Sequence, residues 1–233
     1  NYVVRRYDMG GLFGYDGSQS TKSWFGNHNV NGKLNFGMSE ISFYYGTNQQ
    51  YFEELWYKRT ETFTFEDGSQ YHRHQQTEPV YSKGYDGNGG LTYNLQDGNK
   101  YMLNITAKLN HGADPTREEK GKLYTEEYPE LVTDRIDMYH ASDFTPSLDI
   151  YYQRNLKNKQ FLAFNAVGTY MRTTRQSQYK EFLNNEPIVD YTSSVKGKKY
   201  SLIAEGIYEK SFANGGRLNT GIKHTQSYTN NLY

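Results

Sequence analysis

Residues 90–110 carry the feature that most narrowly limits the fold, because apolar and polar residues alternate on both sides of an Asp97-Gly98 turn. The apolar residues of one parity are Leu91, Tyr93 and Leu95 before the turn and Tyr101, Leu103, Ile105, Ala107 and Leu109 after it. Period-two alternation around a dipeptide that tolerates positive φ predicts a β-hairpin with one apolar face. The opposite face carries polar residues: Thr92, Asn94, Gln96, Asn104, Thr106, Lys108 and Asn110. This face has to meet water or a polar interior.

Two all-β architectures satisfy a hairpin of this kind. In a soluble sandwich the apolar face forms the core, whereas in an outer-membrane barrel it faces lipid and the polar face lines the lumen. The 233-residue chain is 35% hydrophobic with a mean hydropathy of −0.94, yet 16% aromatic with 24 Tyr. This composition is too polar for an ordinary packed core and too aromatic for a disordered chain. Tyrosine suits membrane interfaces and also sugar-binding or protein-binding surfaces.

Charge and cysteine content exclude several classes of function. Lys+Arg and Asp+Glu both number 26, so no net field attracts nucleic acid, and we expect no nucleic-acid partner. The chain has no cysteine, which removes disulfides, Cys-ligated zinc and thiol nucleophiles and fits a cell-envelope compartment. No apolar run of about 18 residues predicts a transmembrane helix. Asn1 reads as the middle of a strand, so we expect that the gene product begins earlier.

Turn signals predict a series of hairpins. Tight turns are expected at 37–40, 96–99, 155–159 and 213–216, with another at Asp67-Gly68. Long polar connections are expected as loops at the opposite end, at about 112–143 and 173–196. About nine strands result, at 9–22, 28–37, 41–65, 70–96, 99–110, 144–154, 159–173, 197–211 and 217–229. Strands of some 25 residues exceed the roughly 9 to 11 that cross a bilayer, and an odd count predicts part of a larger barrel.

Three stretches resemble the TonB-dependent-receptor-like outer-membrane β-barrel family of Bacteroidetes. They are FTPSLDIYYQRNLKNKQFLAFNAVGTY (144–170), YSLIAEGIYEKSF (200–212) and RLNTGIKHTQSYTNNLY (217–233). The opening NYVVRR (1–6) is similar to the strand with which such receptors leave the plug domain. The resemblance covers nearly the whole chain, through patterns of Tyr, Gly and alternating residues. It implies a plug before Asn1, further strands after Tyr233 and partnership with the TonB system through that plug, in a barrel of the 22-stranded transporter type.

Candidate binding and catalytic residues have ordinary explanations as well. His72 and His74 share one strand face and could supply two metal ligands, although ordinary polar strand residues fit better. The segment Asp86-Gly87-Asn88-Gly89-Gly90 lacks the calcium-loop pattern and is expected to be a turn. Carboxylate pairs at Glu53-Glu54, Glu118-Glu119 and Glu126-Glu127 are adjacent in sequence, whereas a glycosidase places its carboxylates across a cleft. The aromatic pairs fit interfacial girdles or, in a soluble protein, a sugar-stacking platform: Tyr44-Tyr45, Tyr51-Phe52, Trp56-Tyr57 and Tyr151-Tyr152.

The sequence therefore predicts an all-β, antiparallel up-and-down transmembrane β-barrel, with residues 1–233 as part of one barrel domain of a Gram-negative outer membrane. The expected function is nutrient uptake by a TonB-dependent receptor of unknown substrate, without enzyme activity, cofactor or metal and with outer-membrane lipid as a partner. Substrate contacts are expected in the loops at 112–143 and 174–196. The alternative is a soluble or surface-attached all-β glycan-binding module with two packed sheets.

The two hypotheses differ in what surrounds the apolar face and the polar face of the strands. A barrel exposes one apolar set on its outside: Leu103, Ile105, Leu148, Ile150, Leu202 and Tyr208. It lines its lumen with a polar set: Asn104, Thr106, Lys108, Asp149, Gln153, Glu205 and Glu209. A soluble module instead buries the apolar set in its core.

Overall fold

The computed structural model describes residues 7–22 and 24–233, and this part of the chain forms one antiparallel sheet of eleven strands. The opening residues 1–6, which resemble the strand that leaves a plug domain, lie outside the described residues. The strands are β1 (Tyr7–Gln19), β2 (Gly26–Gly37), β3 (Ser39–Leu55), β4 (Lys58–Thr64), β5 (Gln70–Thr77), β6 (Val80–Asp97), β7 (Tyr101–Thr125), β8 (Thr133–Leu156), β9 (Gln160–Leu183), β10 (Glu186–Ser211) and β11 (Arg217–Leu232). No helix of the described residues is long and apolar enough to cross a membrane.

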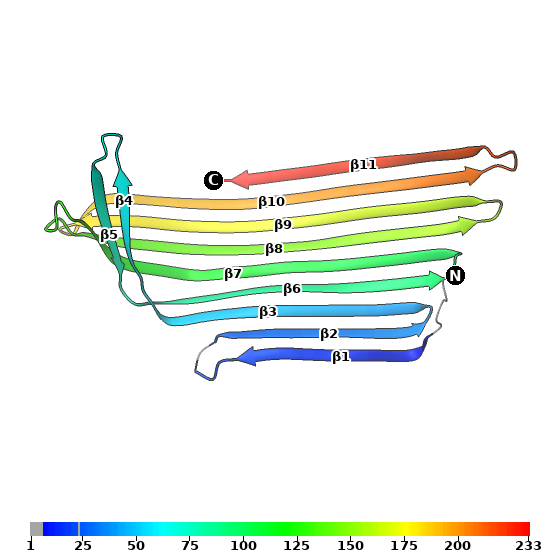
Figure 1. Ribbon diagram of the computed structural model, residues 1–233, viewed down its shortest axis with the longest axis horizontal. Helices are drawn as coiled ribbons and strands as arrows, with labels where there is room; N and C mark the ends of the chain where they lie inside the picture. The colour runs from blue at the N-terminus through cyan, green and yellow to red at the C-terminus, as the bar shows by residue number, and fades with distance from the viewer. Residues whose placement is uncertain (1–6, 23) are drawn as a thin grey trace.

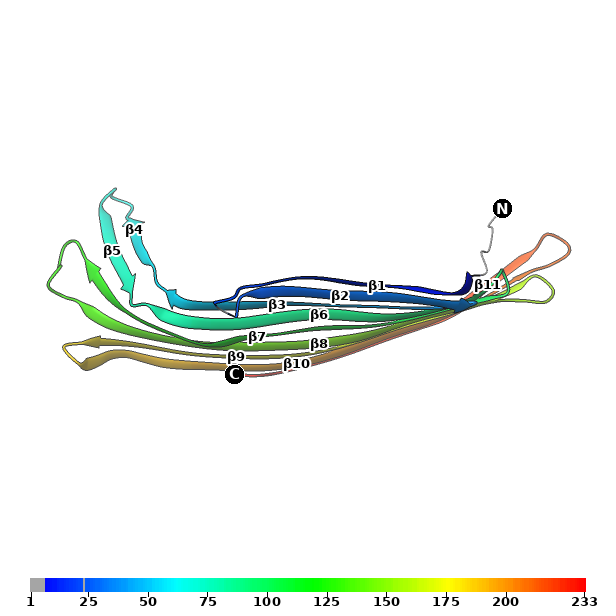
Figure 2. The same cartoon turned by 90° about the horizontal axis from the view of Figure 1, so that it is seen from below.

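The strands lie side by side in the order β1-β2-β3-β6-β7-β8-β9-β10-β11 (Figure 1). The hairpin formed by β4 and β5 leaves this path at one end of the sheet, where β5 pairs with β7. Seen from below, the sheet is a single curved layer, and the β4–β5 hairpin and the far tips rise to the same side (Figure 2). The sheet is not closed, because β1 and β11 form its two edges.

Tight turns join the strands at the end opposite the β4–β5 hairpin, as predicted. Gly37, Gly98 and Gly215 have φ values of 57°, 52° and 84°, which a glycine adopts without steric cost. The β8–β9 turn places Asn158 and Lys159 at φ 59° and 55°. Two successive positive φ values define the turn whose twist matches a hairpin. Gly68, at φ 81°, confirms the predicted turn between β4 and β5.

The predicted count of nine strands is wrong, because each of the two longest expected strands is divided. The segment 41–65 is split into β3 and β4 at Trp56-Tyr57, and the segment 70–96 is split into β5 and β6 at Glu78-Pro79. Proline has no N–H for a ladder hydrogen bond, so Pro79 ends the pairing of β5. The two breaks allow β4 and β5 to form their own hairpin, which docks on β7.

The predicted loops at 112–143 and 173–196 are also wrong, because both are hairpins of continuous strands. β7 continues to Thr125 and β8 begins at Thr133, while β9 and β10 are joined by Asn184-Asn185 alone. The φ values of these two residues are 51° and 65°. The segments carry no apolar alternation, but a hydrogen-bonded ladder depends on the backbone, and their Thr, Tyr and Val residues favour strands. The ladders therefore extend well past the apolar part of the sheet.

The alternation places residues on two faces as predicted. Ile105, Ile150 and Ala166 are paired in register across β7, β8 and β9, and Ala166 is paired with Ala204 of β10. Directly paired residues project to the same side, so these side chains share one face, here called the apolar face. Thr106 and Asp149 are paired in register on the opposite, polar face. Every member of the two predicted sets falls on its expected face.

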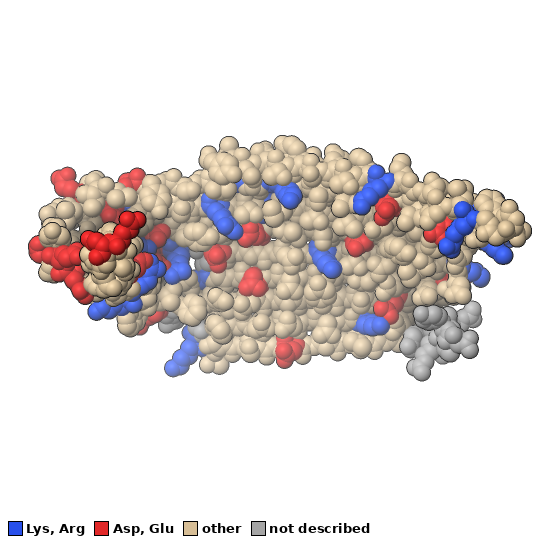
Figure 3. Space-filling model, turned by 45° about the horizontal axis from the view of Figure 1, so that its top comes forward, with Lys and Arg blue, Asp and Glu red and all other residues tan. Residues whose placement is uncertain are grey.

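No second layer covers the apolar face in the described part of the chain. Leu148 is 44% exposed and Ile222 is 79% exposed, and the buried apolar residues are limited to Leu123, Ala141 and Ala163. A two-sheet sandwich of these residues is therefore not present. One broad view shows charged side chains scattered along the sheet and gathered at the end that carries the β4–β5 hairpin (Figure 3).

Candidate functional site

A polar cluster with buried Gln75 and Glu119 at its centre lies where the β4–β5 hairpin meets β7 and β8. We call it the Glu119 network; its members are Tyr57, Gln75, Arg117, Glu119, Arg135 and Asp137. The Tyr57 hydroxyl donates to Glu119 Oε2 at 3.0 Å and accepts from Gln75 Nε2 at 2.7 Å. The link between β3 and β4 is thereby tied to β5 and to β7.

Two arginines neutralise the carboxylates of the Glu119 network. Arg117 Nη2 pairs with Glu119 Oε1, and Arg135 Nη2 lies 3.5 Å from Glu119 Oε2 and 2.7 Å from Asp137 Oδ2. The side chains of Glu119 and Arg135 are only 10% and 11% exposed. Burial lowers the pKa of the Arg135 guanidinium, but the hydrogen bond to Asp137 and the nearby Tyr57 outweigh it, so the pKa is raised above its ordinary value. Arg135 therefore remains charged, and the network is a compensated ionic cluster.

The Glu119 network fastens the β4–β5 hairpin to β7 and β8. Only five residue pairs join β5 to β7, from Arg73↔Thr125 to Thr77↔Gly121. The Tyr57 backbone N–H donates to Thr77 Oγ1 at 2.8 Å, which fastens the same corner. Both carboxylate oxygens of Glu119 have partners and the side chain is only 10% exposed, so the contacts of this residue are those of a structural ion pair.

An aromatic pair continues the network toward solvent on the same polar face. The Arg135 guanidinium carbon lies 5.4 Å from the centre of the Tyr179 ring, which stacks on Tyr191 at a centroid distance of 5.4 Å. Burial and a hydrogen bond to Glu181 raise the pKa of the Tyr179 phenol. Tyr191 is 55% exposed. Stacked phenol rings beside charged groups give an amphipathic surface of the kind that contacts sugars or peptides.

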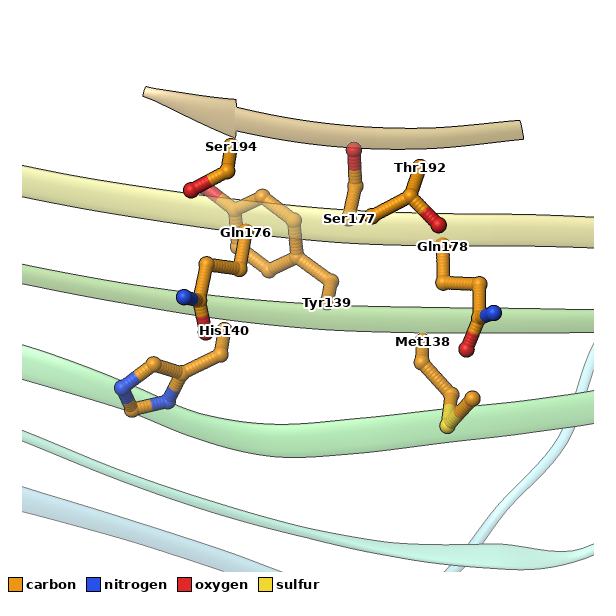
Figure 4. Close-up of a pocket in the computed structure, with 8 residues that line it drawn as sticks. All are labelled: Met138, Tyr139, His140, Gln176, Ser177, Gln178, Thr192 and Ser194. Atoms are coloured by element: carbon orange, nitrogen blue, oxygen red, sulfur yellow. The ribbon is translucent and has the colours of Figure 1, made fainter. Parts of the chain in front are cut away.

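A second candidate site is a cleft of about 450 Å³ across β8, β9 and β10 (Figure 4). His140, Gln176 and Ser194 are paired in register across the three strands, and so are Met138, Gln178 and Thr192. These six side chains lie on the extension of the apolar face, opposite the Glu119 network. The His140 Nδ1 atom is buried and lacks a hydrogen-bond partner among the described residues.

The two histidines singled out in the sequence share a face, as expected, and contact neighbouring polar groups. His72 Nδ1 lies 3.1 Å from Thr62 Oγ1, and His74 Nδ1 lies 2.9 Å from Thr60 Oγ1. His74 also stacks on Tyr124. Within 7–22 and 24–233, no three His, Asp or Glu residues form a group that could hold a metal ion.

The prediction of a turn at Asp86–Gly90 is wrong, because these residues lie inside β6. Their glycines make room for the aromatic rings of β3. A Cβ at Gly90 would come within 2.5 Å of the Tyr44 ring, and one at Gly89 within 2.9 Å of the Tyr45 ring. The glycines that suggested a turn are therefore explained by close packing of aromatic rings against β6.

The carboxylate pairs are separated by strand alternation or exposed in a loop. Glu119 belongs to the Glu119 network, whereas Glu118 points to the other face and pairs with Lys120 at 3.1 Å. Glu126 lies in the β7–β8 loop, where its Oε1 atom is 3.1 Å from His74 Nε2. The side chain of Glu53 lies outside the described residues.

Alternation also divides the aromatic pairs proposed for interfacial girdles. Tyr45 and Tyr152 lie on the apolar face, while Tyr44 and Tyr151 lie on the polar face, because neighbours in a strand project to opposite sides. Tyr57 leaves the main sheet altogether and joins the Glu119 network. Only one member of each strand pair can therefore contribute to a girdle.

Arg135, Asp137 and Tyr179 were not singled out individually, although they lie within the segments 112–143 and 174–196, where substrate contacts are expected. The signal in the sequence is a repeated spacing, since Arg117 and Glu119, like Arg135 and Asp137, are opposite charges two residues apart and hence on one strand face.

Comparisons of the chain with protein-family models, curated proteins and solved structures find no match.

Proposed function

We propose that this chain forms part of the wall of an outer-membrane β-barrel that takes up a nutrient, in the manner of a TonB-dependent receptor. The uncovered apolar face of the sheet carries the proposal. Nine long strands of the main path present one apolar face and one polar face, and no described residue covers the apolar one. A bilayer covers such a face without a second protein layer, because lipid tails replace the missing core.

The aromatic residues of the apolar face support a membrane boundary. Tyr170, Tyr200 and Tyr228 are paired in register across β9, β10 and β11. Near the tight turns, Tyr208 is paired with Leu162. Tyr200 and Tyr208 are eight residues apart, or about 26 Å along the strand. This separation, reduced by strand tilt, approaches the roughly 25 Å apolar band between the aromatic girdles of known barrels.

The strands continue far beyond this band on the side of the β4–β5 hairpin. β10 has 26 residues, or about 86 Å along the strand, so most of it extends outside a bilayer. Tight turns on one side and long extensions on the other fit a barrel whose turns are periplasmic and whose extensions face outward. The Glu119 network and the Tyr179–Tyr191 pair lie in this extension on the polar face, where a nutrient would enter the lumen.

The edges of the sheet fit pairing with further strands. β1 and β11 each present a row of backbone groups without a strand partner in the described part of the chain. Exposed edges of this length promote aggregation, and closure into a barrel removes them. In the proposed receptor, a plug domain inside the barrel links the nutrient site to the TonB system.

The experiment is fractionation of the full-length gene product from its native cells, with gel mobility compared before and after boiling. The proposal predicts recovery in the outer-membrane fraction and a folded band that shifts on boiling. Release as a monodisperse species without detergent would overturn the barrel and favour an all-β glycan-binding module instead.

A further inference from the structure

Along β9 and β10, the apolar face changes its chemistry in a fixed order. On β10, every second residue outward reads Leu202, Tyr200, Lys198, Lys196 and Ser194. Residues two apart on a strand share a face, and we call each such position along the strand a level. From the tight turns outward, an apolar level is followed by an aromatic level, a cationic level and a hydroxyl level.

β9 repeats the order at the same levels, whereas β8 has Phe144 opposite Arg172 and carries no cation there. Arg172 of β9 is paired in register with Lys198, and Thr174 is paired with Lys196. The level below is aromatic, because Tyr170 is paired with Tyr200. The graded surface thus spans at least two strands and borders the apolar band directly.

The three cations Arg172, Lys196 and Lys198 are exposed and make no ion pair among the described residues. Two other cations on this side have carboxylate partners, since Lys180 lies 3.1 Å from Asp190 and Lys120 lies 3.1 Å from Glu118. What distinguishes Arg172, Lys196 and Lys198 is that the three lie next to one another on two paired strands. Paired strands lie about 4.8 Å apart and alternate residues about 6.6 Å apart, so one phosphate can contact all three side chains.

The cleft next to the cations offers hydrogen-bonding groups. His140, Gln176 and Ser194 occupy the level beyond Lys196, and His140 Nδ1 is buried without a partner in the described part of the chain. A buried polar atom without a partner is costly, and a ligand hydroxyl or amide can satisfy it.

We infer that this surface binds a phosphorylated glycolipid of the outer leaflet. The inference rests on the proposed function, because the apolar band has to lie in a membrane. Acyl chains contact the apolar level, a phosphate contacts Arg172, Lys196 and Lys198, and sugar groups fill the cleft around His140. The order of the levels matches the order of these groups in the lipid, which a free anion does not require.

The test uses the full-length protein, purified in detergent and titrated with phosphorylated lipid A while bound lipid is counted by native mass spectrometry. The variant replaces Arg172→Gln, Lys196→Gln and Lys198→Gln together. Each basic residue near an anionic lipid contributes about fivefold to binding, so the triple variant is expected to bind on the order of 100-fold more weakly. Lipid A from which the phosphate has been removed is expected to bind wild type as weakly as the variant binds the phosphorylated form.

The control replaces three exposed cations of the polar face, Lys108→Gln, Arg175→Gln and Lys199→Gln, and is expected to retain wild-type affinity. Equal weakening in both variants, or in neither, would overturn the inference. Displacement of the lipid by millimolar inorganic phosphate would overturn it as well, because the site would then hold a free anion. The folded band that shifts on boiling is read for each variant, so that failure of the lipid site is distinguished from failure of the barrel.

Discussion

Replacement of Glu119 by alanine is predicted to loosen the β4–β5 hairpin while the main sheet stays folded. The change removes the acceptor of the Tyr57 hydroxyl and the partner of Arg117. Loss of one member of a buried ion pair costs about 3–5 kcal/mol. Arg135 keeps Asp137 at 2.7 Å, so we take a local cost of about 2 kcal/mol. Since β5 is held to β7 by five residue pairs, this cost falls on opening of the hairpin.

Hydrogen exchange of the full-length protein, followed by mass spectrometry of peptides covering 58–77, measures this opening. A cost of about 2 kcal/mol predicts exchange about 30-fold faster in these peptides, with peptides of β9 and β10 unchanged. The matched control is Glu118→Ala, on the same strand but on the other face, in a surface pair whose loss costs about 0.5 kcal/mol. If Glu118→Ala accelerates exchange as much as Glu119→Ala, the bracing role of the Glu119 network is refuted.

Three further predictions concern particular residues. Gly121→Ala places a Cβ within 2.5 Å of the Gln76 carbonyl oxygen, so it should lower the free energy of opening the β4–β5 hairpin by about 1–3 kcal/mol. Gly168→Ala, whose Cβ would have nothing within 4 Å, should leave hydrogen exchange of the hairpin unchanged. Asn158→Val forces a β-branched residue to φ 59° and should reduce the free energy of unfolding by about 1–2 kcal/mol, whereas Asn158→Gly should not reduce it. The readout is the temperature at which the folded band is lost on a gel, which should fall for Asn158→Val alone. The pKa of Tyr179 is raised above 10.0, so its contribution to stability is complete below pH 10 and is lost as pH rises through the folded pKa. Absorbance titration should therefore show a late phenol that Tyr179→Phe removes, and an unchanged titration would contradict this.

The hairpins of the apolar region could be predicted from the sequence because two independent signals agree there. Asp97-Gly98 supplies the turn, and residues such as Leu103 and Ile105 supply the alternation, so register and face follow together. The same agreement holds at the β10–β11 turn around Gly215. These are local features, and a single strand pair carries them.

The extensions and the site could not be predicted in the same way. Beyond Asn110 in β7 and before Thr145 in β8, apolar residues are few and lie on both faces, with Leu123 and Ala141 on the polar one, so the ladder continues without a one-sided hydrophobic pattern to mark it. The Glu119 network joins Tyr57 to Glu119 and Arg135, residues 62 and 78 positions away in sequence. Only the docking of β5 on β7 brings them together, and that contact depends on the break at Pro79.

The central claim is that lipid covers the apolar face. Residues 1–233 contain no cysteine, so single cysteines at Leu148, Asp149, Ile150 and Tyr151 of β8 each add one thiol to this region for a fluorophore. Quenching by lipids that carry a doxyl group in the acyl chain should be strong at Leu148→Cys and Ile150→Cys and weak at Asp149→Cys and Tyr151→Cys, in the full-length protein in membranes. Equal quenching at all four positions, or none at any, would contradict the account.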